Sequence, residues 1–207
     1  MKITLSGRMM PMMMKAALKS ELNKLMASFK VEAALKAADR EYEGIIARTP
    51  NIGGDKNPFL STLYVGAYAV AVYKMIKGDV TVEALGDMIA DALNRLDLVK
   101  KLAGKTDYLS PEHVEKEREN ARWLDAHTAL GNWAYTVESA DENALVLCYR
   151  SCGLYEMVKR EKVPEVAPVL CRTDKMIYGL SGYEAAQEKS FEDGGGTCVI
   201  RVQRSKA

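Results

Sequence analysis

Hydrophobic residues near the start of the chain recur at intervals that place them on one side of a helix, with charged residues between them. The hydrophobic positions are Leu18, Leu22, Leu25, Met26 and Phe29. This pattern predicts one helix over residues 12–48. It ends in the segment RTPNIGGDKNP, because Pro50 disfavours the helical conformation at Thr49.

Residues 57–73, NPFLSTLYVGAYAVAVY, carry no charge. The stretch is marginal for a membrane span, which needs about 20 apolar residues, and it opens with the polar residues Asn57, Ser61 and Thr62. A buried central helix therefore explains it better than a membrane span. Two further helices are predicted, one after Thr81 and a charged one that runs from Ser110 to about Arg122.

The hydrophobic period changes in the last part of the chain. Four short segments, WAYTVES, ALVLCY, EAAQEKSF and TCVIRVQ, read as strands, and residues 141–143 and 194–196 read as hairpin loops. Helices are predicted between the hairpins, over 151–160 and 165–180. The pattern predicts an α+β fold with an antiparallel sheet of about four strands, formed by one domain over 1–207 that is mainly helical to residue 125 and contains the sheet over 126–207.

Composition and charge narrow the classes of partner. The chain has 207 residues, is 48% hydrophobic and 28% charged, and balances 29 Lys and Arg against 28 Asp and Glu for a net charge of +1. No basic stripe is present, so nucleic acid is not an expected partner. The methionine-rich start is broken by Arg8, Pro11 and Lys15 and does not resemble a signal peptide, so we expect a cytoplasmic protein.

Common catalytic signatures are missing from the sequence: it contains no GxxxxGK[ST], GxGxxG, HExxH or GxSxG. Its four cysteines, Cys148, Cys152, Cys171 and Cys198, include no CxxC pair, so we expect no metal and no cofactor. On a strand, Cys198 shares a face with Ile200 and Val202 and is expected to point inward.

The segment VAPVLCRTDKMIYGL holds the strongest candidate site. Cys171 and Asp174 are three residues apart and share a face of the predicted helix, where the carboxylate could accept a proton from the thiol or from water. Arg172 or Arg150 could hold a substrate carboxylate in bidentate fashion. The competing interpretation is an aspartate that caps a turn and a cysteine that packs. The glycines at 194–196 indicate a turn or a place where a ligand approaches the backbone.

Three segments, RTPNIGGDKNPF, LCYRSCGLYEMVKREKVPEVAPVLCRTD and GGGTCVIRV, together resemble the L-2-amino-thiazoline-4-carboxylic acid hydrolase family. The family motifs correspond here to residues 51–54, to the Cys-x-x-Asp motif at 171–174, and to the glycine-cysteine segment at 195–198. One departure is Val199-Ile200, where the family pattern has Asp-Phe, and this exchange removes a polar group beside Cys198.

The resemblance implies hydrolytic ring opening of a small cyclic isothiourea, L-2-amino-thiazoline-4-carboxylate, to N-carbamoyl-L-cysteine. It implies that Asp174 is the general base or the partner of the amidinium, and that Cys171 is the nucleophile or lies beside the reacting carbon. It also implies that Arg172 or Arg150 binds the carboxylate. The remaining substrate-binding candidates are Cys152, Cys198 and Gly195.

Two other classes of function fit the sequence. The late glycine-cysteine segment also resembles, more distantly, vinyl-reductase-type small-molecule-binding domains, which would make the protein a sensor without turnover. The methionine-rich start would suit a subunit that binds another protein, because methionine surfaces adapt to their partners. A homo-oligomer is compatible with each of these functions.

Overall fold

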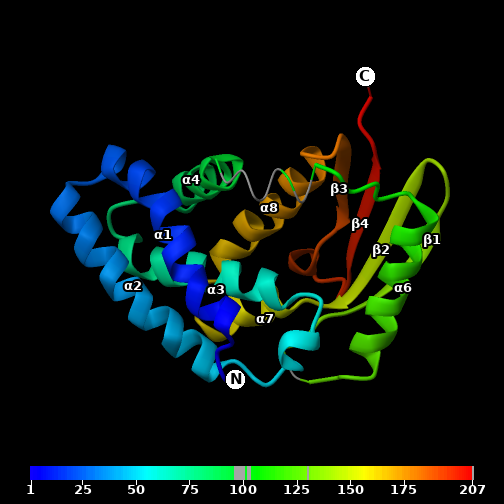
Figure 1. Ribbon diagram of the computed structural model, residues 1–207, viewed down its shortest axis with the longest axis horizontal. Coiled ribbons are helices and arrows are strands. Elements are labelled where there is room, and N and C mark those ends of the chain that lie inside the picture. Colours follow the sequence, from blue (N-terminus) through cyan, green and yellow to red (C-terminus); the bar gives the residue numbers. More distant parts are fainter. Residues whose placement is uncertain (96–100, 102–103, 130, 207) are drawn as a thin grey trace.

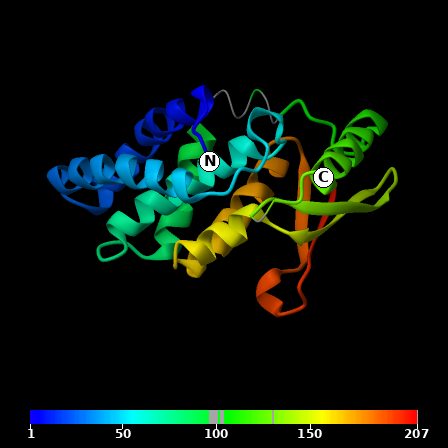
Figure 2. The same cartoon turned by 90° about the horizontal axis from the view of Figure 1, so that it is seen from below.

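The computed structural model describes residues 1–95, 101, 104–129 and 131–206. Figures 1 and 2 show helices α1–α4 grouped at one end of the molecule and the sheet at the other, with α7 and α8 between them. The helices of the first part are α1 (Leu5–Leu25), α2 (Ser28–Arg48), α3 (Leu60–Ile76), α4 (Val82–Arg95) and α6 (Pro111–Asp125).

The uncharged segment forms α3, which is buried around most of its circumference. Gly66 and several alanines make its surface narrow, so neighbouring helices approach it closely. In the described parts of the chain, no helix combines the length and the hydropathy needed to cross a membrane. The prediction of a buried central helix is confirmed.

The prediction of one helix over 12–48 is wrong. The chain leaves the helical conformation at Met26 and Ala27, which are extended, and then turns back as α2. Leu18 and Leu22 are buried, but Leu25 and Phe29 beside this turn are 53% and 75% exposed. The break has a physical reason: α1 and α2 both pack against α3, which a single straight helix could not do along its whole length.

The second part of the chain forms the sheet and two helices. Its elements are β1 (Ala134–Ala140), β2 (Ala144–Ser151), α7 (Gly153–Arg160), α8 (Ala167–Gly179), β3 (Tyr183–Lys189) and β4 (Cys198–Arg204), with the 3₁₀ turns η1 (Gly54–Lys56), η2 (Pro164–Val166) and η3 (Phe191–Asp193). The four strands pair antiparallel in the order β1-β2-β4-β3. The predicted α+β fold is confirmed.

The register of the sheet decides which side chains face the helices. Tyr149 of β2 lies opposite Cys198 of β4, and Cys148 lies opposite Val199. Since side chains alternate along a strand, Tyr149 and Cys198 share one face and Cys148 and Val199 share the other. Helix α6 packs against β1 and α8 against β3.

Candidate active site

A cavity of about 410 Å³ lies where α7 and α8 meet the sheet. Residues from α3, α7, α8, η3 and strands β2, β3 and β4 contribute to its wall. Aromatic side chains form much of the lining: Phe59, Trp133, Tyr149, Tyr155, Tyr178 and Phe191. The cavity therefore lies between the helical part of the chain and the sheet.

Three of the four cysteines line this cavity. Cys152 is the residue before α7, Cys171 belongs to α8, and Cys198 belongs to β4. Cys198 is buried as expected, and Gln187 of β3 donates a hydrogen bond from Nε2 to its Sγ over 3.5 Å. Cys148 is not among the lining residues, and burial together with a hydrogen bond to Glu138 raises the pKa of its thiol.

One stripe of α8 faces the cavity. Cys171, Lys175 and Tyr178 follow each other at one-turn intervals, and all three line both the cavity and a small recess against Ala185 of β3. Asp174 lies in the same helix, but its side chain is outside the described part of the structure. Lys175 and Gln187 are site residues that the sequence pattern did not identify.

The structure separates the two predicted arginines. Arg172 lines the cavity, and its guanidinium pairs with Asp87 of α4 at the surface. Arg150 is not among the lining residues and forms an ion pair with Asp125 over 2.7 Å. Within the described residues, Lys175 is a cation of the cavity wall that forms no ion pair.

The glycine segment shapes a turn beside the cavity. Gly194 and Gly196 have φ angles of 76° and 68°, which glycine adopts without strain. A Cβ atom at Gly195 would meet open space, and Gly195 is not among the residues that line the cavity. The side chains from this loop that do reach the cavity are Phe191 and its neighbours Ser190 and Glu192.

A close contact at Gly153 sets the position of α7. A Cβ atom there would lie 2.5 Å from the indole ring of Trp133 and 2.7 Å from the carbonyl oxygen of Gly131. Only glycine therefore lets the start of α7 rest against Trp133. This contact brings Cys152 and Trp133 to the same cavity wall.

Two buried amides hold the segment that carries Trp133. Asn57 donates from Nδ2 to Oδ1 of Asn132 over 2.9 Å, and the same oxygen accepts the backbone N–H of Trp133. Asn132 in turn donates to the carbonyl oxygen of His127 over 2.8 Å. The loop before α3 thus fixes the segment before β1.

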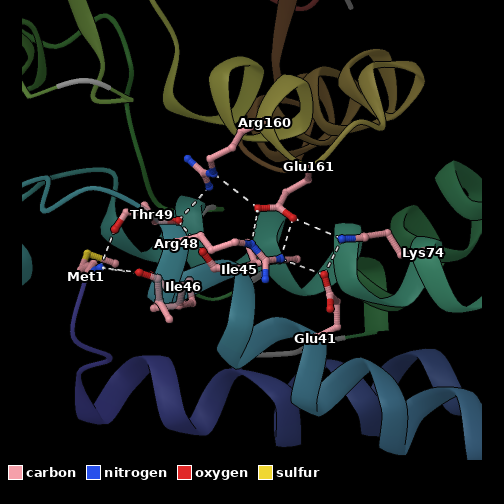
Figure 3. A network of polar contacts seen from close by, with 10 residues as sticks. Met1, Glu41, Ile45, Ile46, Arg48, Thr49, Lys74, Arg160 and Glu161 are labelled. Atoms are coloured by element: carbon pink, nitrogen blue, oxygen red, sulfur yellow. Dashed lines mark hydrogen bonds and ion pairs between the residues drawn. The ribbon is translucent and has the colours of Figure 1, made fainter.

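A cluster of charged side chains holds the C-terminal end of α7 (Figure 3). Glu161, which ends the helix, accepts hydrogen bonds from Arg48 over 2.7 Å and from Lys74 over 3.2 Å. Glu41 pairs with the same two cations. Burial opposes the ionisation of Glu161, but the hydrogen bonds from Arg48 and Lys74 outweigh it and hold its pKa below the ordinary value.

The network continues toward the end of α2. Arg160 donates to Oγ1 of Thr49 over 2.9 Å, and the amine of Met1 lies against the carbonyl oxygens of Ile46 and Thr49 (Figure 3). Helices α2, α3 and α7 are therefore joined through polar contacts as well as through the hydrophobic core.

The chemistry available in the cavity is that of thiols, cations and aromatic rings. Among the described residues, no group of three or more His, Cys, Asp or Glu side chains is arranged to hold a metal ion. The four cysteines carry thiols and form no disulfide in the described part of the chain. A thiol beside cationic side chains suits attack on an electrophilic carbon in an anionic molecule.

Comparison with known proteins agrees with the sequence motifs. No curated protein matches this chain. The model of the L-2-amino-thiazoline-4-carboxylic acid hydrolase family matches residues 61–202, a range that includes α7, α8, β1, β2 and β3 in full and most of α3 and β4. The chain belongs to the L-2-amino-thiazoline-4-carboxylic acid hydrolase family.

Proposed function

We propose that this protein is a hydrolase that opens a small cyclic amidine or isothiourea, such as L-2-amino-thiazoline-4-carboxylate, to N-carbamoyl-L-cysteine. The observation that carries the proposal is the position of Cys171: the cysteine of the family's Cys-x-x-Asp motif lines a cavity together with two other thiols and two cationic residues. A nucleophile in a concave, largely apolar site is the usual arrangement for covalent catalysis.

The reaction proceeds in two steps. The Cys171 thiolate attacks the ring carbon that lies between nitrogen and sulfur, and the carbon–sulfur bond of the ring breaks. Its electron pair leaves on the ring sulfur, which takes up a proton and becomes the thiol of the product. Water then attacks the same carbon, its oxygen becomes the carbonyl of the product, and the Cys171 thiolate is expelled. One water is consumed, and both leaving groups are thiolates that need little acid assistance.

We propose the other roles from the sequence motif and from the lining of the cavity. Asp174, in the next turn of α8, is the general base for water or the partner of the substrate amidinium. Arg172 lines the cavity, but its guanidinium pairs with Asp87, so Arg172 would have to leave this ion pair to bind the substrate carboxylate. Arg150 would have to leave Asp125 to take the same role. Since the four cysteines carry thiols and form no disulfide in the described structure, a reducing compartment suits the protein, and we propose that it acts in the cytoplasm.

The test is incubation of the purified protein with L-2-amino-thiazoline-4-carboxylate, with N-carbamoylcysteine followed by mass spectrometry. We expect product from the wild-type protein and from Cys148→Ala, whose thiol lies outside the cavity wall. We expect a loss of at least about 100-fold in rate for Cys171→Ala and Asp174→Asn, because each removes a group that acts in the transition state.

Two other results would contradict the proposal. If the folded wild-type protein gives no product but binds the compound, it is a ligand-binding module rather than a hydrolase. If Cys171→Ala retains full activity, the reaction takes place without the proposed nucleophile. Circular dichroism of each variant separates lost chemistry from lost folding.

A further inference from the structure

The cavity is large for the compound that gives the family its name. At about 410 Å³ it falls within the range of roughly 300–1,000 Å³ that holds ligands of drug size. A single thiazoline ring with one amino group and one carboxylate is much smaller than such a ligand. It would leave a large part of this cavity to water.

The cavity has an aromatic wall. Tyr155 of α7 and Phe191 of η3 stack with their ring centroids 5.3 Å apart and their planes at 22°. Phe59 and Trp133 form a second stacked pair with centroids 4.9 Å apart. Phe59, Tyr155 and Phe191 remain partly exposed, so apolar ring surface is open to the cavity. Covering this surface with an apolar group of a ligand would be favourable.

Positive and negative side chains lie on different parts of the cavity wall. Lys175 lies one helical turn after Cys171, and among the described residues it has no carboxylate partner, whereas Arg172 is paired with Asp87. The loop that carries Phe191 has Glu192 on the cavity wall instead. An anion is therefore attracted toward Cys171 and Lys175 and repelled from the loop.

We propose that the substrate is a larger cyclic amidine or isothiourea than L-2-amino-thiazoline-4-carboxylate, a proposal that rests on the hydrolase function proposed above. It is a cyclic amidine or isothiourea whose carboxylate pairs with Lys175 and whose second, aromatic group lies against Tyr155 and Phe191. In this arrangement the ring carbon reaches Cys171 while Arg172 keeps its ion pair with Asp87.

The experiment compares two ligands, L-2-amino-thiazoline-4-carboxylate and its 5-phenyl derivative. Dissociation constants are measured by calorimetry on Cys171→Ala protein, which cannot consume them, and turnover is measured on the wild-type protein. We expect the phenyl derivative to bind about 10- to 100-fold more tightly, because it buries a ring that the parent lacks. Phe191→Ala should remove most of that advantage.

The role of the Lys175 charge is tested by further substitutions in the Cys171→Ala protein. Lys175→Gln should weaken both ligands about fivefold or more, and Lys175→Arg should restore binding. Lys36→Gln serves as the matched control, because Lys36 is an exposed lysine of α2 that does not line the cavity. The effect of Lys175 should also shrink as salt is added.

Each outcome decides one part of the proposal. If the parent compound binds as tightly as the phenyl derivative or more tightly, the proposal that the substrate carries an aromatic group is wrong. If Lys175→Gln leaves binding unchanged, the proposal that Lys175 binds the carboxylate is wrong. Tight, Lys175-dependent binding of the phenyl derivative without product from the wild-type protein would support the ligand class and contradict the hydrolase function. Turnover of the parent compound, without tighter binding of the phenyl derivative, would support the hydrolase function and contradict the larger ligand class.

Discussion

Glu161 shows how a single side chain supports the site from a distance. Its carboxylate is only 3% exposed and accepts hydrogen bonds from Arg48 and Lys74, which come from two other helices. A buried carboxylate without such partners would lose more by leaving water than it gains. Because Glu161 ends α7, these contacts also hold the helix whose beginning lies at the cavity.

We predict that Glu161→Gln lowers the free energy of unfolding by about 1–2 kcal/mol at pH 7, since hydrogen bonds to charged groups are stronger than neutral ones. The folded state depresses the pKa of Glu161 below 4.5, so its contribution is fully present above that pH and disappears as the pH falls through the folded-state pKa. Urea unfolding at pH 7 and pH 3 measures the difference between wild type and variant.

The control for this prediction is Glu115→Gln, which removes an exposed ion pair with Arg122 and should change little at either pH. A stability difference for Glu161→Gln that persists undiminished at pH 3 would show that the ionised carboxylate is not what stabilises the fold.

Single residues differ in how well the sequence predicts them. The sequence identifies Cys171 as a candidate through its spacing from Asp174, and the structure places Cys171 on the cavity wall, while its catalytic role stays a prediction. Lys175 and Gln187 could not be identified from the sequence, because a lysine on a helix and a glutamine on a strand are ordinary surface residues until the fold places them on a cavity wall. Arg150 had a suitable side chain, but its ion pair with Asp125 depends on tertiary contacts.

At the scale of elements, α7 is positioned by the absence of a side chain. Gly153 gives Trp133 the space it occupies, and the two buried amides Asn57 and Asn132 hold the backbone of Trp133 in place. The segments before α3, before β1 and at the start of α7 therefore depend on each other. Together they form one wall of the cavity.

Gly153→Ala should destabilise the protein by about 1–3 kcal/mol, because the added methyl group overlaps the indole ring of Trp133 and a backbone oxygen. Thermal unfolding measures the loss, and tryptophan fluorescence should report the displaced ring. Gly179→Ala is the matched control, since a Cβ atom there meets open space near the end of α8. Equal stability of the two variants would contradict the packing account.

Elements with a strong local pattern could be predicted from the sequence. Strands β1 and β4 follow their β-branched residues and turn signals closely, and the helix opened by Ser110 begins where its capping hydroxyl accepts the N–H of His113. The break between α1 and α2 could not be predicted, since residues 26 and 27 carry no helix-breaking signal. Packing of both helices on α3 decides it.

Over the whole molecule, the cavity exists because distant segments converge. Strand β2 leads into Cys152 and α7, the pairing of Tyr149 with Cys198 brings β4 alongside, and α8 contributes Cys171. The sequence predicts the α+β class but not this convergence, which depends on strand order and register. The interpretation of residues 1–207 as one domain, and the formation of a homo-oligomer, stay predictions.

The most direct test of the central claim is a search for the covalent intermediate on Cys171. Wild-type protein is mixed with L-2-amino-thiazoline-4-carboxylate, quenched in acid within milliseconds to seconds, and analysed by intact-protein and peptide mass spectrometry. We predict an added mass equal to the whole substrate, because ring opening keeps the ring sulfur on the bound molecule, and we predict that it maps to the peptide that contains Cys171. Product formation with the adduct on Cys152 or Cys198, or with full turnover in Cys171→Ala, would contradict the account.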